Sequence, residues 1–324
     1  MKSYFQIEAY LGCGSSGHWA EISAEMDRQT KRLPSPGREL AEYLLGARGK
    51  GLRACLLLLC NGLFGKLSNQ AYPLAAALEL THAASLLHDD IQDGSEMRRG
   101  RPCAYLCFGV KEAMLTGDAL LAAALRICTD CGFSISQVYS GAVEAMVHGQ
   151  IMETNPSPCP ELYRQIIFKK TGSLMGAACE MGAVLAGQSG HRQALLRTFG
   201  QNLGAAYQIA DDWRDFLPKS KTGKDQGRDI LTGNITLPLR FYLDTLPPKE
   251  QQRLSRRIEA RQIEQDELEA ACQAVYGCAL KARCREYLDS FLEVSRKSLS
   301  PLPPSQEKTI LLDITAQISA CLED

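Results

Sequence analysis

Two acidic stretches decide the fold: residues 82–93 read HAASLLHDDIQD, and residues 207–216 read YQIADDWRDF. In each stretch an apolar run with helical spacing leads into a DDxxD group. Asp89 and Asp93 fall on one helix face a turn apart, and Asp211 and Asp215 do the same. The pattern therefore predicts two helices that each carry a carboxylate cluster at the end of an apolar face.

Carboxylates gathered in this way repel one another and are costly to bury unless cations neutralise them. Oxygen ligands with open coordination positions suit Mg²⁺, which keeps several waters and bridges to substrate phosphates. For a single DDxxD group, a solvent-exposed acidic face is the alternative interpretation. Two copies, each ending an apolar helix and each followed by basic residues, favour a magnesium-bound diphosphate.

Basic and polar side chains near both acidic groups are candidates for holding the anion. Arginine binds phosphate oxygens through two parallel hydrogen bonds, and lysine acts as a point charge. The candidates are Lys50, Arg53, His82, Arg98, Arg99, Lys170, Thr171, Gln208 and Lys224. Taken singly, each basic pair would be a solvated surface feature and His82 a core histidine. Their placement beside the carboxylates predicts phosphate binding instead.

Composition narrows the class of protein. The chain has 324 residues, of which 45% are apolar and 23% charged, with a net charge of −1. This balance is typical of a globular protein and argues against a nucleic-acid partner. The N-terminus lacks a basic region followed by an apolar run, and the longest apolar runs, such as 54–60, are too short to span a bilayer. We therefore expect a cytoplasmic protein without a transmembrane segment.

The cysteines do not indicate a disulfide framework, because their number, 13, is odd. Most lie in apolar helical stretches, where a reduced thiol behaves as a small apolar side chain. A zinc site is the weaker alternative, and its spacing is imitated only loosely by Cys103, Cys107, Cys128 and Cys131.

Helical periodicity runs along almost the whole chain, and strand-like alternation is nearly absent. The predicted helices are 19–33, 37–47, 51–64, 68–92, 112–131, 134–152, 160–188, 190–216, 235–246, 249–275, 276–299 and 304–322. Motif-bearing segments flank every Pro- or Gly-rich break, so no break reads as a domain linker. We expect one all-α domain, a large helical bundle over residues 1–324, with a flexible N-terminal segment at 1–18.

Together these segments resemble the trans-prenyltransferase (polyprenyl synthase) family, in particular its medium- and long-chain members. GKGLR, HAASLLHDDIQDGSEMRRGRP, the Gly149-Gln150 pair, KTG, YQIADDWRDF and GKDQGRDILTGNITLP match its motifs in order, from about residue 45 to about 240. The resemblance implies an isoprenoid synthase fold with a central active-site cavity. It also implies condensation of isopentenyl diphosphate with an allylic diphosphate.

The resemblance further implies a role for each candidate. Lys50, Arg53, His82 and Arg99 would hold isopentenyl diphosphate. Arg98, Lys170, Thr171, Gln208 and Lys224 would hold the allylic diphosphate. Asp89, Asp93 and Asp211 would be the principal Mg²⁺ ligands, with Asp90, Asp212 and Asp215 completing the acidic shell. Three Mg²⁺ ions with substrate bound, a homodimer and peripheral membrane contact during product release are further expectations.

Product length is predicted from two small residues before the first acidic group. Ser85 lies one turn before Asp89 on nearly its face, and the family uses this position and Ala84 as a floor for the growing chain. Because both are small, we expect a long cavity and a product longer than about C20. The alternative is a shorter product, with Leu121 or Leu125 of a neighbouring helix blocking the tunnel.

Two other functions stay open at this point. A class I terpene cyclase also uses an aspartate-rich helix end, but it would not need the isopentenyl diphosphate ligands. A regulatory subunit of a heteromeric synthase would lack some of the Asp or Arg ligands, all of which are present here. A catalytic subunit that requires a dissimilar partner is a third possibility.

Overall fold

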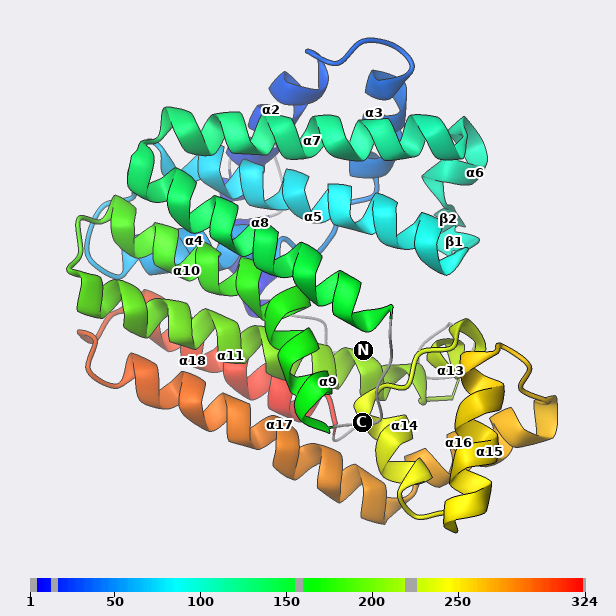
Figure 1. The fold of residues 1–324 in the computed structure, drawn as a ribbon. Coiled ribbons are helices and arrows are strands. Elements are labelled where there is room, and N and C mark those ends of the chain that lie inside the picture. The colour runs from blue at the N-terminus through cyan, green and yellow to red at the C-terminus, as the bar shows by residue number, and fades with distance from the viewer. Residues whose placement is uncertain (1–4, 13–16, 155–159, 219–225, 323–324) are drawn as a thin grey trace.

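A computed structural model describes residues 5–12, 17–154, 160–218 and 226–322 of the chain. Its elements are almost all helices, which confirms the predicted all-α class (Figure 1). They are α1 (Phe5–Leu11), α2 (His18–Thr30), α3 (Gly37–Gly46), α4 (Leu52–Gly62), α5 (Ala71–Asp93), β1 (Met97–Arg98), β2 (Arg101–Pro102), α6 (Ala104–Phe108), α7 (Val110–Asp130), α8 (Phe133–Glu153), α9 (Pro160–Ile167), the π-helical turn η1 (Phe168–Gly172), α10 (Ser173–Leu185), α11 (Gly190–Asp215), α13 (Arg228–Thr232), α14 (Leu237–Leu243), α15 (Pro248–Glu259), α16 (Gln265–Tyr276), α17 (Cys278–Leu299) and α18 (Gln306–Ala320).

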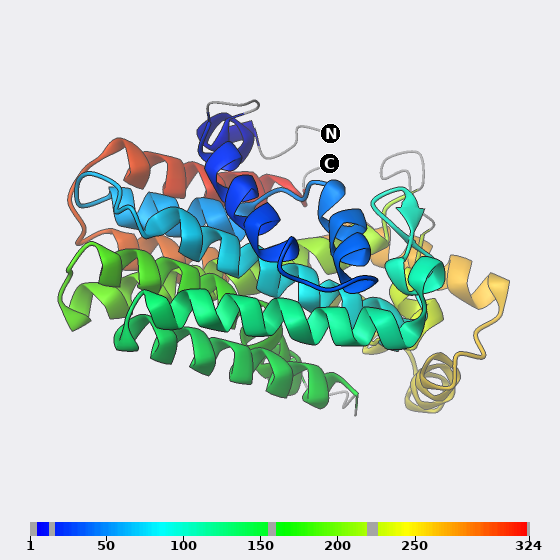
Figure 2. The same ribbon diagram turned by 90° about the horizontal axis from the view of Figure 1, so that it is seen from above.

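Long helices lie side by side and make up the body of the molecule, as Figures 1 and 2 show from two directions. α10 is the most buried of them: its residues from Ser173 to Ala183 are all buried. It packs against α4, α8 and α11. Its sequence, SLMGAACEMGA, is rich in small residues, so neighbouring helices can approach closely while the larger side chains fill the core.

α5 and α11 run toward the same end of the bundle, where the β1–β2 hairpin and α13 also lie (Figure 1). α5 ends at Asp93 because Gly94 adopts a left-handed conformation with φ 64°, which closes the helix. Near this end, Arg228 of α13 donates a hydrogen bond to the Ser95 hydroxyl. The two acidic groups, 122 residues apart in sequence at Asp89 and Asp211, are thereby brought to one end of the molecule.

Four features differ from the sequence-based predictions. β1 and β2 form an antiparallel hairpin in register Met97–Pro102. A single helix over 249–275 is wrong, since Arg261 adopts φ 56° and separates α15 from α16. The helix predicted over 160–188 is interrupted by η1 and ends at Leu185. Residues 5–11, expected to be flexible, form α1, with Ile7 fully buried.

Within the described residues, no helix is long and apolar enough to cross a membrane.

Candidate active site

The end of α5 carries Asp89 and Asp93 in a crowded acidic environment. The pKa of Asp89 is raised to about 6, chiefly by burial; Lys170 lowers it, while the neighbouring carboxylates of Asp93 and Glu153 raise it. Burial likewise raises the pKa of Asp93. Lys170 forms an ion pair with Glu153, which closes α8. The predicted cluster is therefore present, and its lysine is shared with a carboxylate that sequence reasoning did not assign.

Asp90, the second aspartate of the first group, pairs with Arg98. It is 2% exposed, and its Oδ1 accepts two hydrogen bonds from the Arg98 guanidinium, from Nε at 2.9 Å and from Nη2 at 2.5 Å. This ion pair fastens the β1–β2 hairpin to α5. The hairpin turn consists of Arg99 and Gly100, both with positive φ, as a two-residue turn between right-twisted strands requires.

Lys170 and Thr171 belong to the π-helical turn η1. The close packing of α8 against this turn explains why the Gly149-Gln150 pair occurs on α8. A Cβ at Gly149 would lie 2.5 Å from the backbone nitrogen of Lys170, so only glycine allows α8 to approach η1 this closely. Gln150 donates a hydrogen bond to Gln92 of the first acidic group at 2.9 Å. The pair thus joins the segment that presents Lys170 to the end of α5.

At the end of α11, Asp211 is exposed and Asp212 is buried. Both oxygens of Asp212 accept hydrogen bonds, from the Tyr163 hydroxyl at 2.6 Å and from Gln208 Nε2 at 2.8 Å. Gln208 in turn accepts from the Thr171 hydroxyl at 2.7 Å. Burial raises the pKa of Asp212 to about 7, although both hydrogen bonds lower it. Gln208 and Thr171 are therefore held by one buried carboxylate.

Asp215 accepts a hydrogen bond from the backbone nitrogen of Asp229 at 2.8 Å. Asp229 is half-buried, and desolvation together with the nearby carboxylates of Asp215, Asp212 and Asp211 raises the pKa of its carboxyl well above the usual range. Asp229 and Glu153 lie beside the two acidic groups, and neither was assigned to the site from the sequence. Both lie in segments already recognised as motifs: Glu153 follows the Gly149-Gln150 pair by one turn, and Asp229 ends the GKDQGRD stretch.

The structure places the predicted isopentenyl diphosphate ligands together in a second, cationic cluster. Lys50 Nζ donates to the Tyr207 hydroxyl at 3.3 Å. Burial lowers the pKa of Arg53 and of His82, and the nearby Arg99 guanidinium lowers both further. Arg53 also lowers the pKa of His82. Arg53 Nε is buried and has no hydrogen-bond partner among the described residues, as expected of a donor that awaits an anion.

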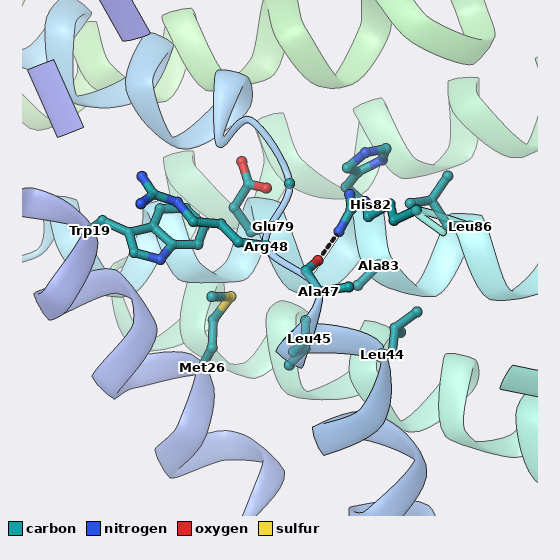
Figure 3. A pocket seen from close by; sticks show the side chains of 12 residues that line it. Trp19, Met26, Leu44, Leu45, Ala47, Arg48, Glu79, His82, Ala83 and Leu86 are labelled. Atoms are coloured by element: carbon teal, nitrogen blue, oxygen red, sulfur yellow. Dashed lines mark hydrogen bonds between the residues drawn. The ribbon is translucent and has the colours of Figure 1, made fainter. Parts of the chain in front are cut away.

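A pocket with an empty volume of about 380 Å³ adjoins this cluster. Figure 3 shows it, with Glu79 and His82 of α5 facing the loop that carries Ala47 and Arg48. Arg99 donates a hydrogen bond to the Ala47 carbonyl. Its left-handed backbone turns the side chain away from the hairpin and toward this loop.

The donor set fits Mg²⁺ in character but does not form a cage. No group of three His, Cys, Asp or Glu side chains within the described ranges lies close enough to hold a metal ion. Mg²⁺ is commonly bound through one or two carboxylates, with waters and substrate phosphates completing the shell. Lys224 lies outside the described residues.

The two residues predicted to determine chain length differ in exposure, since Ala84 is buried and Ser85 is half-buried. Ala84 is fully buried, and the Ser85 hydroxyl donates to the His82 carbonyl at 2.8 Å. Of the two residues that could block the tunnel instead, Leu125 is 45% exposed, whereas Leu121 is half-buried and packs against the core, so the alternative stays open through Leu121. Deeper in the bundle, the hydroxyls of Thr81 on α5 and Tyr139 on α8 form a buried hydrogen bond of 2.8 Å.

Comparisons with known proteins agree with this geometry. Residues 36–275 match the family model described as polyprenyl synthetase. A short chain isoprenyl diphosphate synthase of Methanothermobacter thermautotrophicus is 34% identical over 248 residues, which cover 73% of this chain and 76% of the relative. Heptaprenyl diphosphate synthase component 2 of Geobacillus stearothermophilus is 31% identical over 309 residues, covering 92% and 94%.

The solved structures include a polyprenyl synthase from Caulobacter crescentus, complexed with calcium and isoprenyl diphosphate. It superposes with a TM-score of 0.89 at 27% identity, covering 98% of both chains. The family match spans most of the chain, and its motifs are the segments that meet at the ends of α5 and α11. The chain therefore belongs to the polyprenyl synthetase family of trans-prenyltransferases.

Proposed function

We propose that the chain is a Mg²⁺-dependent enzyme that condenses isopentenyl diphosphate with an allylic diphosphate to give a trans-polyprenyl diphosphate longer than about C20. The observation that supports this most is the presence of two separate sites at one end of the bundle. One is acidic and lies around Asp89, Asp93 and Asp211; the other is cationic and lies around Arg53 and Arg99. A condensation of two diphosphates needs both.

In this proposal Asp89, Asp93, Asp211 and Asp215 hold the metal ions, three with substrate bound. Mg²⁺, when bound, would stabilise the negative charge that develops on the leaving diphosphate. Lys170 and Arg98 would add positive charge at the same place, since preorganised cations stabilise a leaving anion most effectively in a site that excludes water. Thr171 and Gln208, held by Asp212, would orient the allylic diphosphate. Lys224, which lies outside the described residues, would also hold the allylic diphosphate.

The cationic cluster would hold the second substrate. Arg53 and Arg99 would bind the diphosphate of isopentenyl diphosphate, with Lys50 and His82 beside them. Fixing this diphosphate would orient the isopentenyl double bond toward the allylic carbon, and correct orientation alone can supply a large share of the rate. The apolar surroundings would keep water away from the reactive allylic group.

A product longer than about C20 is supported by the small side chains of Ala84 and Ser85 beneath the first acidic group. A shorter product is the second candidate, favoured by the Thr81–Tyr139 hydrogen bond. Thr81 lies eight residues before Asp89, which corresponds to about 12 Å along the helix. This pair would then close the channel at that depth.

We also propose that the chain forms a single domain and acts as a homodimer. Apolar side chains on the neighbouring helices α7 and α8 are between 45% and 75% exposed: Val110, Met114, Leu115, Leu125, Phe133, Val147 and Ile151. An exposed apolar face of this kind commonly marks an association surface. The name of the Geobacillus relative, component 2, raises the alternative of a dissimilar partner.

One assay tests these points. The purified chain is incubated with farnesyl diphosphate, isopentenyl diphosphate and Mg²⁺, and the products are sized. We expect products beyond C20 that disappear when the metal is chelated. Products that stop at C15 or C20 would refute the long-chain assignment, and a cyclic hydrocarbon formed from one substrate would refute the condensation. Inactivity of the single chain would point to a second component.

A further inference from the structure

The cationic cluster also contains one carboxylate, whose negative charge is unfavourable in a site that would bind an anion. Glu79 of α5 lies three residues before His82, is 8% exposed and lines the same pocket (Figure 3). A buried carboxylate is costly unless it is paired and hydrogen-bonded. A negative charge beside the diphosphate would also oppose substrate binding. Its presence here therefore calls for a structural reason.

Glu79 completes the first turn of α4. Its Oε1 accepts a hydrogen bond from the backbone nitrogen of Ala54 at 3.0 Å, and the backbone N–H of Arg53 also faces the carboxylate. α4 begins at Leu52, so these are orphan donors of a helix N-terminus. The residue at the N-cap is Gly51, which has a left-handed backbone and no side chain to accept them. A side chain from α5 supplies the missing acceptor.

The same carboxylate lies near two arginines: Arg99 lines the pocket with it, and Arg53 directly precedes Ala54, whose backbone nitrogen it accepts from. Burial lowers the pKa of both Arg53 and Arg99, the Glu79 carboxylate acts in the opposite direction on each, and Arg99 lowers the pKa of Arg53 further. Two like charges that face one ligand position repel each other and would turn apart without a counter-charge. Since Arg53 is itself in the first turn of α4, Glu79 acts on its backbone and its charge at once.

We propose that Glu79 is the positioning residue of the isopentenyl diphosphate half of the site: it fixes the start of α4 and holds Arg53 and Arg99 toward one diphosphate. This inference rests on the proposed function. It predicts that Glu79 acts on isopentenyl diphosphate and not on the allylic substrate, whose proposed ligands include Lys170 and Thr171 on η1 and Gln208 on α11.

The test compares Glu79→Gln and Glu79→Ala with the wild-type chain. KM is measured separately for isopentenyl diphosphate and for farnesyl diphosphate at saturating Mg²⁺. We expect Glu79→Ala to raise the KM for isopentenyl diphosphate roughly tenfold or more, because it removes the acceptor and the counter-charge. Glu79→Gln, which keeps one acceptor oxygen, should raise it by a smaller factor. KM for farnesyl diphosphate should stay within about twofold of wild type.

Glu180→Gln is the matched control. Glu180 is also 8% exposed and pairs with an arginine, Arg197, at 3.4 Å, but it lies on α10 outside the pocket. Neither KM should change in this variant.

If Glu79→Ala fails to fold, as judged by circular dichroism, the KM values of Glu79→Gln alone test the proposal. Should both fail, Ala54→Pro removes one donor without altering the carboxylate and should raise the KM for isopentenyl diphosphate a few-fold.

Several results would overturn the proposal. A lower KM for isopentenyl diphosphate in Glu79→Gln would mean that the carboxylate merely opposes the anion. Equal changes in both KM values, or no change in either, would show that Glu79 has no specific role in this half of the site. An inactive wild-type chain would instead count against the proposed function itself, so the two failures are distinguishable.

Discussion

Replacement of Tyr163 by Phe removes one hydroxyl from the buried network behind the end of α11. That hydroxyl donates to one oxygen of Asp212 at 2.6 Å, while Gln208 donates to the other. Hydrogen bonds to charged groups contribute about 1.5–3 kcal/mol, and Asp212 is only 6% exposed. We therefore expect the free energy of unfolding to fall by about 2 kcal/mol, which corresponds to a loss of roughly 4 °C in melting temperature.

The functional effect should be selective. Asp212 holds Gln208, and Gln208 accepts a hydrogen bond from Thr171, so a loosened Asp212 disturbs two proposed allylic ligands together. If about 1.4 kcal/mol of the lost energy reaches the bound substrate, the KM for the allylic diphosphate rises about tenfold. KM for isopentenyl diphosphate should not change, because its proposed ligands belong to α4, α5 and the hairpin turn.

Steady-state kinetics with each substrate varied in turn would measure this, together with thermal melting. Tyr72→Phe serves as the control, because it loses a hydrogen bond to His18 of 2.8 Å away from the site. It should lower stability and leave both KM values unchanged. If Tyr163→Phe loses stability while the allylic KM stays at the wild-type value, the network is structural only, and the reasoning about Gln208 and Thr171 is refuted.

Three further predictions follow from other parts of the molecule. Ser85→Phe should shorten the product seen by mass spectrometry, since it places a large ring beneath the first acidic group; an unchanged length would mean that the floor lies elsewhere. Leu115→Asp puts a charge on the exposed apolar face of α7 and should yield a monomer in sedimentation experiments, whereas a persistent dimer would exclude this face. Burial raises the pKa of Glu79, so the stability contributed by its protonated form is fully present below the usual value of 4.5 and is lost as the pH rises through the folded value. Melting temperatures between about pH 4 and pH 8 should therefore fall more in wild type than in Glu79→Gln, and parallel curves would contradict this.

Most helices could be predicted from the sequence because their burial follows a helical period. The exceptions are places where one residue or a short segment departs from that period. Arg261 takes a left-handed conformation inside an amphipathic stretch, and nothing in the pattern of 249–275 signals it. The hairpin around Arg99 has strands of two residues, too short to show alternation. The π-helical turn inserts its extra residue without breaking the apolar pattern of the surrounding helix.

The candidate site could be located from the sequence because each of its motifs is a short local segment. The contacts that join the site residues to one another could not be predicted. Tyr163 and Asp212 are 49 residues apart, and Glu79 meets Ala54 across 25. Tyr163 stands in an ordinary helical stretch, so neither spacing nor composition distinguishes it from a surface tyrosine. Glu153 is an intermediate case. It follows the Gly149-Gln150 motif by one turn, but only its ion pair with Lys170 shows that it belongs to the site.

In both DD pairs the two aspartates have different roles, and the difference follows from helix geometry. Consecutive residues on a helix are about 100° apart, so two adjacent carboxylates cannot both face one ligand. In each pair the first member, Asp89 or Asp211, is the one proposed to hold metal. The second is buried and bound to another element: Asp90 to Arg98 of the hairpin, Asp212 to Tyr163 of α9.

The buried member of each pair therefore needs a partner, because an unpaired carboxylate in the core would be strongly destabilising. That requirement fixes where the hairpin and α9 attach, and these are the elements that carry Arg98 and lead into Lys170. Removing Asp90 or Asp212 should consequently displace the phosphate ligands before it alters the metal site. On this reasoning the second aspartate of each motif is needed to hold the cationic side chains in place, and the first to receive the cation.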